Sequence, residues 1–282
     1  MQLRSEFGKV GWYPNTKEAL IDYIDQTTQK EWTINQPTAL ICPHAGYRYC
    51  GSILGHAMSS ISNQLIEHII VIGPSHYVAL KNQWIVPIDA SFTTEIGTSH
   101  LNSDCLSNIS KLDGCLQNNE IFKQEHSIWM MLPFIQHLLP NATISPIIIG
   151  NISNDQCKLL AKTIKTHQSK STLVVISSDF THYGPNFNYV PFTNDISNKI
   201  KQIDKKALGF IQSKDALGFW NWFHNFQTTI CGRYAISLLL ELLNNDDEIL
   251  DAKYQQSGEL NNEWLNSVSY YGLIIGKESK ND

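Results

Sequence analysis

The chain has 282 residues, of which 42% are hydrophobic and 17% are charged, and this composition excludes an intrinsically disordered protein. Its 21 basic and 26 acidic residues give a net charge of −5 without a basic stripe, so we expect no nucleic-acid partner. No stretch has the length and apolarity of a signal peptide or a membrane span, which predicts a cytoplasmic protein that does not enter membranes.

Short apolar runs typical of strands alternate along the chain with segments typical of helices. Strands are expected near 38–43, 68–73, 84–88, 142–149, 172–177 and 267–275, and helices near 16–29, 49–60, 128–139, 155–167, 196–211 and 233–243. This alternation predicts an α/β fold, with a central, mostly parallel or mixed sheet flanked by helices, as a single domain over residues 1–282. The stretch 98–125 has no clear period and fits either an excursion over a pocket mouth or plain surface.

Three histidines follow apolar runs of the kind that forms buried strands. His44 follows the run 38–43, His76 follows 68–73, and His182 follows 172–177. Ligand sites in parallel α/β sheets lie beyond the carboxyl ends of the strands. One such histidine is most simply a hydrogen-bonding residue of a turn, but three at equivalent places predict a shared pocket that holds a metal.

Cys231 differs in its setting from the other five cysteines. It lies in a loop directly before the predicted helix 233–243, and a thiol near a helix amino-terminus is favoured as thiolate. The alternative is a buried cysteine that only fills space. Together with two imidazoles, Cys231 would complete a His₂Cys set suited to zinc, iron or copper, with one coordination position left for water or substrate.

Three more residues are candidates for proton transfer or for orienting a bound group. Asp179 and His182 follow the same strand, and Asp179 has the alternative role of capping local amides in a turn. His126 opens the predicted helix 128–139, where it either points into the cleft or, with Glu125, caps the helix.

These segments resemble the Memo proteins, found in animals as cell-motility effectors and in microbes as protein B of the AmmeMemoRadiSam set. The resemblance covers nearly the whole chain and is carried in order by Gly11-Trp12-Tyr13-Pro14, Pro43-His44-Ala45-Gly46-Tyr47, Gly73-Pro74-Ser75-His76, Glu125-His126-Ser127-Ile128, Ser177-Ser178-Asp179-Phe180-Thr181-His182 and Thr229-Ile230-Cys231-Gly232-Arg233.

The resemblance implies a fold similar to the LigB-type extradiol dioxygenases, which use non-haem iron to open catechol rings. It implies metal ligands at His44, His76 and Cys231, where the dioxygenases have a carboxylate as third ligand. It also implies that Asp179, His182 and His126 line the same pocket. Trp129 stands where the family commonly has glutamate, so a carboxylate at the pocket edge is expected to be missing.

Three functions follow from these observations. The first is a mononuclear metal site that holds iron(II), with copper and zinc as alternatives, and supports oxidoreductase or dioxygenase-like chemistry on a small molecule. His182 then acts as acid and base, and Asp179 orients it. The second is a non-catalytic module that binds a protein or peptide partner in the inherited cleft, which Trp129 favours. The third is a zinc-dependent hydrolase, which lacks an evident general-base glutamate.

Overall fold

The apolar runs form the centre of one large sheet in the computed structural model, which describes residues 1–29, 32, 36–62 and 64–278. In that part of the chain the sheet has nine strands, in the order β10-β12-β2-β9-β3-β8-β4-β7 with β11 paired to β12. The strands are β2 (Ala39–Cys42), β3 (His68–Pro74), β4 (Trp84–Val86), β7 (Cys115–Gln117), β8 (Thr143–Ile149), β9 (Thr172–Ser177), β10 (His182–Tyr183), β11 (Glu248–Gln256) and β12 (Ser267–Gly276).

The four strands β2, β9, β3 and β8 are parallel neighbours, whereas β12 and β4 run antiparallel to them on either side. Side chains alternate between the two faces, as in β3, where Ile70 and Ile72 enter one core and Ile69 and Val71 enter the other. Both faces are therefore covered, and the predicted α/β fold with a mixed central sheet is confirmed.

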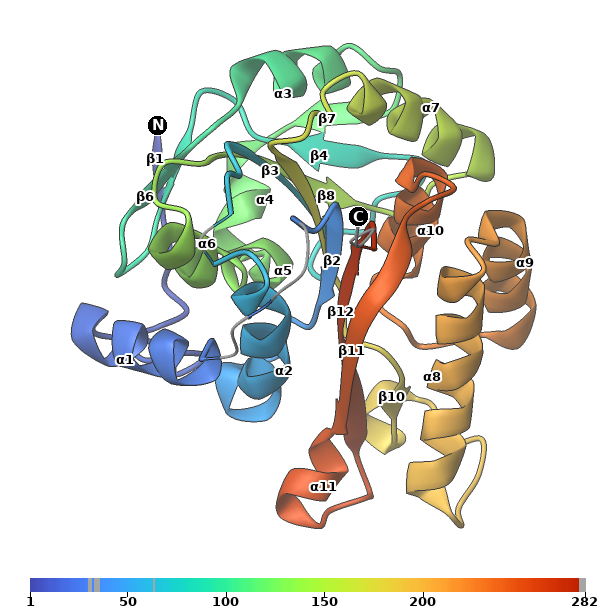
Figure 1. Ribbon diagram of the computed structural model, residues 1–282. Helices are drawn as coiled ribbons and strands as arrows, with labels where there is room; N and C mark the ends of the chain where they lie inside the picture. Colours follow the sequence, from blue (N-terminus) through green and yellow to red (C-terminus); the bar gives the residue numbers. More distant parts are fainter. Residues whose placement is uncertain (30–31, 33–35, 63, 279–282) are drawn as a thin grey trace.

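Helices cover the two faces of the sheet in separate sets (Figure 1). The first face carries α1 (Lys17–Thr27), α2 (Tyr47–Ser59), α4 (Asn119–Gln124), α5 (His126–Trp129) and α6 (Leu132–Leu138). The second carries α3 (Ser103–Ser110), α7 (Asn154–Lys165), α8 (Ile196–Gln212), α9 (Ala216–Phe226) and α10 (Arg233–Leu242). Two short elements complete the fold, a 3₁₀ turn at Pro185–Phe187 and α11 (Ser257–Asn261). In the described ranges, no helix combines the length and apolarity needed to cross a bilayer.

The predicted helix 128–139 is two helices, α5 and α6, so this prediction is wrong in its continuity. Pro133 stands in the first turn of α6. Proline has no N–H to donate to the carbonyl four residues earlier, whereas in a first turn that N–H is not needed. The chain therefore ends α5 at Trp129 and starts a new helix at Leu132.

The segment 98–125, which has no clear period, folds into short elements. It contributes β6 (Thr98–His100), α3, β7 and α4, and β6 joins β1 (Gln2–Arg4) and β5 (Ser91–Thr93) in a small sheet of their own. The residues that line the large cavity described below lie in 74–82, 149–153, 182–187 and 220–234. The segment thus does not line this cavity, but it is not plain surface either, because Phe122 is fully buried and Glu125 is 1% exposed and bonded to His76.

The central strands bring three of the candidate segments to one edge of the sheet. β9 lies between β2 and β3, and the three strands are parallel. Their carboxyl ends therefore meet at the same edge, where His44 follows β2, His76 follows β3 and Asp179 follows β9.

Candidate metal centre

The hydrogen bonds of His44 leave one of its ring nitrogens without a proton. The residue is 1% exposed, and its Nδ1 lies 2.8 Å from Ser177 Oγ. Because the Ser177 hydroxyl donates its hydrogen to the Ser127 carbonyl oxygen at 2.5 Å, it accepts one from His44 Nδ1. Nε2 is then unprotonated, and it lies 3.3 Å from Cys231 Sγ.

His76 is held by a carboxylate on its opposite side. Its backbone N–H donates to Glu125 Oε2 and its ring Nδ1 to Glu125 Oε1, both at 2.7 Å. Glu125 is 1% exposed, so this pair of bonds is made away from water. A carboxylate bound to the far nitrogen of a histidine is the usual partner of a metal-binding imidazole, because it fixes the tautomer and ring orientation.

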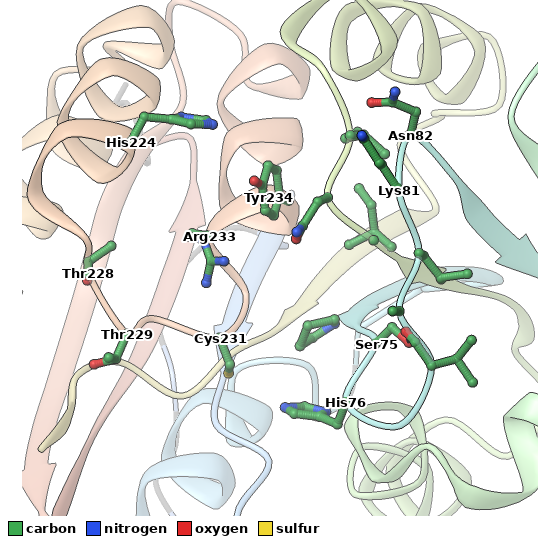
Figure 2. Close-up of a pocket in the computed structure, with 18 of the residues that line it drawn as sticks. Ser75, His76, Lys81, Asn82, His224, Thr228, Thr229, Cys231, Arg233 and Tyr234 are labelled. Carbon is green, nitrogen blue, oxygen red and sulfur yellow. The ribbon is translucent and has the colours of Figure 1, made fainter. Parts of the chain in front are cut away.

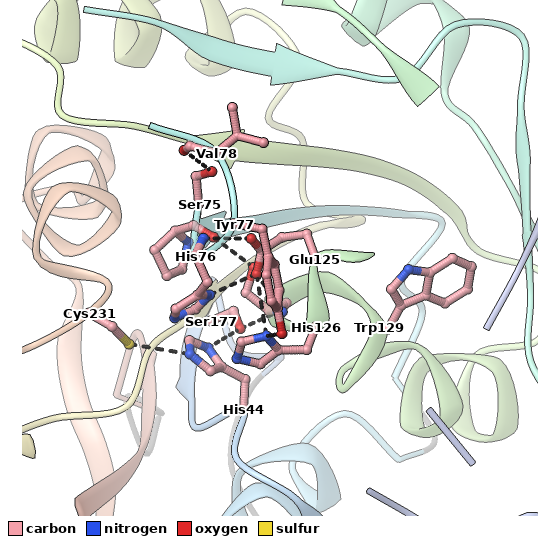
Figure 3. A network of polar contacts seen from close by, with 12 residues as sticks. His44, Ser75, His76, Tyr77, Val78, Glu125, His126, Trp129, Ser177 and Cys231 are labelled. Atoms are coloured by element: carbon pink, nitrogen blue, oxygen red, sulfur yellow. Dashed lines mark hydrogen bonds and ion pairs between the residues drawn. The ribbon is translucent and has the colours of Figure 1, made fainter. Parts of the chain in front are cut away.

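Cys231 reaches the cluster because the loop before α10 packs tightly on the end of β9. The Asp179 backbone N–H donates to Cys231 Sγ at 3.2 Å, and the Gly232 N–H donates to Ser178 Oγ at 3.1 Å. A Cβ on Gly232 would lie 2.4 Å from Ser178 Cβ. Only glycine therefore permits this approach, which brings the thiol to the two imidazoles (Figure 3).

The ligand atoms of His44, His76 and Cys231 all lie within 4.8 Å of one another, and this group could hold a metal ion. Two nitrogens and one sulfur at this spacing form a donor set that suits iron, copper or zinc. His76, Glu125 and His126 form a second group of the same compactness, which shares His76 with the first.

His126 lies beside the cluster, on the side of His76 and His44. Its ring centroid is 4.2 Å from that of His76 and 5.2 Å from that of His44. Its Nδ1 is 3.3 Å from the Tyr77 hydroxyl. The alternative role of Glu125 is also present, since its Oε1 accepts from the Ser127 N–H at 3.2 Å and caps α5.

His182 and Asp179 occupy the same edge but do not act on each other as expected. His182 Nδ1 lies 2.9 Å from the Phe180 carbonyl oxygen and 3.1 Å from that of Thr229, so Nδ1 donates and Nε2 carries the lone pair. Asp179 Oδ1 instead accepts from the backbone N–H of His44 at 2.8 Å. The prediction that Asp179 orients His182 is therefore wrong, because two backbone carbonyls do so.

Burial controls the protonation of the cluster. It lowers the pKa of His44, with further lowering from the neighbouring imidazoles, and it lowers the pKa of both His126 and His182 to about 4. Burial also lowers the pKa of His76, but the bonds to Cys231 and Glu125 outweigh it and raise that pKa to about 10. The pKa of the Cys231 thiol is raised by burial.

Trp129 points away from the cluster, into the core on the first face of the sheet (Figure 3). The side chain is fully buried, its Nε1 donates to the Phe122 carbonyl oxygen at 2.5 Å, and its ring packs 5.1 Å from that of Phe92. Position 129 does not line the cleft. A glutamate at this position would therefore not place a carboxylate in the cleft, and its absence does not alter the cleft. The argument from Trp129 for a non-catalytic module therefore loses its basis.

A cavity of about 890 Å³ opens beside the cluster, and His182 forms part of its wall. His76 and Cys231 line it as well (Figure 2). Its volume is within the range of small-molecule sites. Three roles in this region are not predicted from the sequence: Glu125 as the partner of His76, Ser177 as the partner of His44, and Arg233 as a cavity residue. The Glu125 and Ser177 partnerships join residues 49 and 133 positions apart, so no local motif indicates them.

Known proteins resemble this chain along most of its length. A family model described as "Memo-like protein" matches residues 9–274. "Protein MEMO1" of Xenopus tropicalis is 31% identical over 278 residues, which cover 92% of each chain, and that of Homo sapiens is 29% identical over the same share. "Protein memo-1 homolog" of Caenorhabditis elegans is 30% identical over 86% of this chain and 73% of its own. The chain therefore belongs to the Memo-like protein family.

Proposed function

We propose that His44, His76 and Cys231 bind one transition-metal ion and that the protein is a metal-dependent oxidoreductase. The observation that carries the proposal is the fixed orientation of the two imidazoles. Each has its Nδ1 bonded to an acceptor, Ser177 Oγ or Glu125 Oε1, so that Nε2 is the nitrogen available to a metal. A ring held in this way by its outer nitrogen is typical of metal-ligating histidine.

Iron(II) is the metal we propose, with copper and zinc as alternatives. Imidazole suits all three ions, and a thiolate suits soft or borderline metals. The preference for iron rests on the fold that the Memo resemblance implies, which is similar to that of the iron-dependent LigB-type dioxygenases. When bound, the ion would supply a Lewis-acidic and redox-active centre with coordination positions open to substrate.

His182 in the cavity wall, and His126 and Asp179 beside the cluster, would then position groups and move protons. His182 is neutral and its Nε2 is an acceptor, so it would take a proton from a substrate hydroxyl. His126, packed against His76 and near the Tyr77 hydroxyl, would exchange a second proton. Asp179 would hold the His44 backbone in position through its 2.8 Å hydrogen bond.

Elemental analysis of anaerobically purified protein tests the metal site. We expect near-stoichiometric iron or copper in the wild type and in Cys115→Ser, which changes a cysteine of the outermost strand β7 outside the cluster and the cavity wall. We expect loss of metal in Cys231→Ser and His44→Ala. No metal in the wild type after reconstitution would refute the proposal. If metal is present, oxygen uptake with a panel of catechols tests the oxidoreductase activity.

Two other outcomes would favour the alternative functions. Stoichiometric zinc would support a hydrolase, and a retained metal without oxygen uptake would support a module that binds a protein or peptide partner. In either case we propose one Memo-like domain over residues 1–282, in the cytoplasm and without a nucleic-acid partner.

A further inference from the structure

The cavity beside the cluster has a charge opposite to that of the whole chain. Arg233 and Lys81 line it, and among the residues that the structure describes no aspartate or glutamate does so. The chain as a whole has a net charge of −5. Glu125 lies behind His76, is 1% exposed, and has both oxygens engaged by N–H donors, so it presents no carboxylate oxygen to the cavity.

Arg233 has free hydrogen-bonding capacity on the cavity side. Its Nη1 donates to the Ile230 carbonyl oxygen at 3.2 Å, and its guanidinium carbon lies 5.2 Å from the centre of the Tyr234 ring. No carboxylate within the described ranges forms an ion pair with it. A half-buried guanidinium held on one side and unpaired on the other is suited to bind an anion in bidentate fashion.

Aromatic rings form the wall next to Arg233. Trp220 and Tyr234 both line the cavity, and their ring centroids are 5.7 Å apart. In Figure 2, Arg233 lies between Tyr234 and Cys231, with Lys81 and Asn82 on the opposite wall. An anion at Arg233 would thus have flat apolar surfaces on one side and the thiol of the cluster on the other.

We infer that this cavity binds a small molecule with a planar ring and an anionic group, a carboxylate or a phosphate, and that Arg233 is the main contact of the anion. Lys81 adds positive charge from the facing wall, and Trp220 and Tyr234 contact the ring. The assignment of this molecule as substrate rests on the proposed function, whereas its binding to Arg233 does not require a metal.

Binding of three matched probes tests the inference. The probes are 2-naphthoate, its neutral isostere 2-naphthamide, and 2-naphthyl phosphate, each titrated calorimetrically into the full chain. A charge-assisted hydrogen bond predicts that at least one anion binds about 10-fold or more tightly than the amide. The anion that binds more tightly identifies the group that the site prefers.

Variants separate Arg233 from general charge effects. Arg233→Gln should weaken binding of the preferred anion by about 10-fold and leave the amide within about twofold. Arg233→Lys should retain part of the preference because it keeps the charge but loses the planar fork. Lys162→Gln, which removes an exposed charge on α7 outside the cavity, should change nothing. Matching thermal transitions would show that Arg233→Gln is folded.

Equal affinity of the amide and both anions, no binding of any probe, or unchanged binding of the preferred anion in folded Arg233→Gln would overturn the inference. Repeating the titration on chelator-treated wild type separates it from the metal proposal. An anion preference that persists in a protein that never binds metal would refute the proposed function alone. A metal-loaded protein without anion preference would refute this inference alone.

Discussion

Glu125→Gln probes the part of the site that determines how His76 presents its Nε2. Glu125 accepts two bonds of 2.7 Å from His76, one from the backbone N–H and one from Nδ1. A glutamine has one oxygen in place of two, so one of these buried donors loses its acceptor. Removing such an outer partner typically weakens metal binding by about 10- to 100-fold, or about 1.4 to 2.7 kcal/mol.

The measurement is metal affinity by competition with a chromophoric chelator at fixed pH. Glu120→Gln is the matched control, because that residue lies on the surface of α4, with a side chain that is 69% exposed and paired with Lys123. We expect the control to bind metal as the wild type does. Unchanged affinity in Glu125→Gln, or an equal loss in both variants, would refute the assignment of Glu125 as the partner that positions His76.

Three further predictions concern stability and are measured by urea unfolding. Gly232→Ala should lower the free energy of unfolding by about 1–3 kcal/mol, because the new Cβ would lie 2.4 Å from Ser178 Cβ. Gly209→Ala, with open space around it, should raise that free energy by about 0.5–1 kcal/mol, and equal effects of the two substitutions would contradict this reasoning. Burial raises the pKa of Asp204 from 3.8 to about 6, so the folded state binds its proton more tightly and about 2 kcal/mol of stability is lost as pH rises from 4 to 6. Asp204→Asn should flatten that part of the curve, and an unchanged slope would count against the shift. Trp129→Glu should cost about 4 kcal/mol or more by placing an unpaired carboxylate in the core, and a small loss would show that position 129 reaches water.

The sheet could be predicted where strands are buried on both faces. Runs such as Ile69–Ile72 contain only apolar β-branched residues. Because both faces of such a strand are buried, its sequence is continuously apolar and does not alternate with polar residues. β11 was missed because its residues Glu248–Gln256 pair only with β12 at the side of the sheet and are mostly half-exposed, so they lack an apolar run. The break at Pro133 shows that apolar periodicity alone does not reveal where one helix ends and another begins.

The site could be predicted as far as strand order permits. His44 and His76 share an edge because each follows a parallel strand, and that rule is visible in the sequence. The roles of Glu125 and Ser177 depend on contacts between distant segments, which spacing does not encode. Asp179 illustrates the same limit: it lies between β9 and His182 at the start of β10, yet its carboxylate turns to the backbone of His44.

The distance between Cys231 and His44 along the chain has a consequence for synthesis. Their sulfur and Nε2 lie 3.3 Å apart although 187 residues separate them. On the ribosome His44 emerges long before Cys231, so the cluster assembles only after most of the chain has left the exit tunnel. A nascent chain halted before α10 would present two imidazoles without the thiol. Any ion that needs all three side chains can therefore bind only once Cys231 has emerged, and it would then stabilise the folded state by mass action.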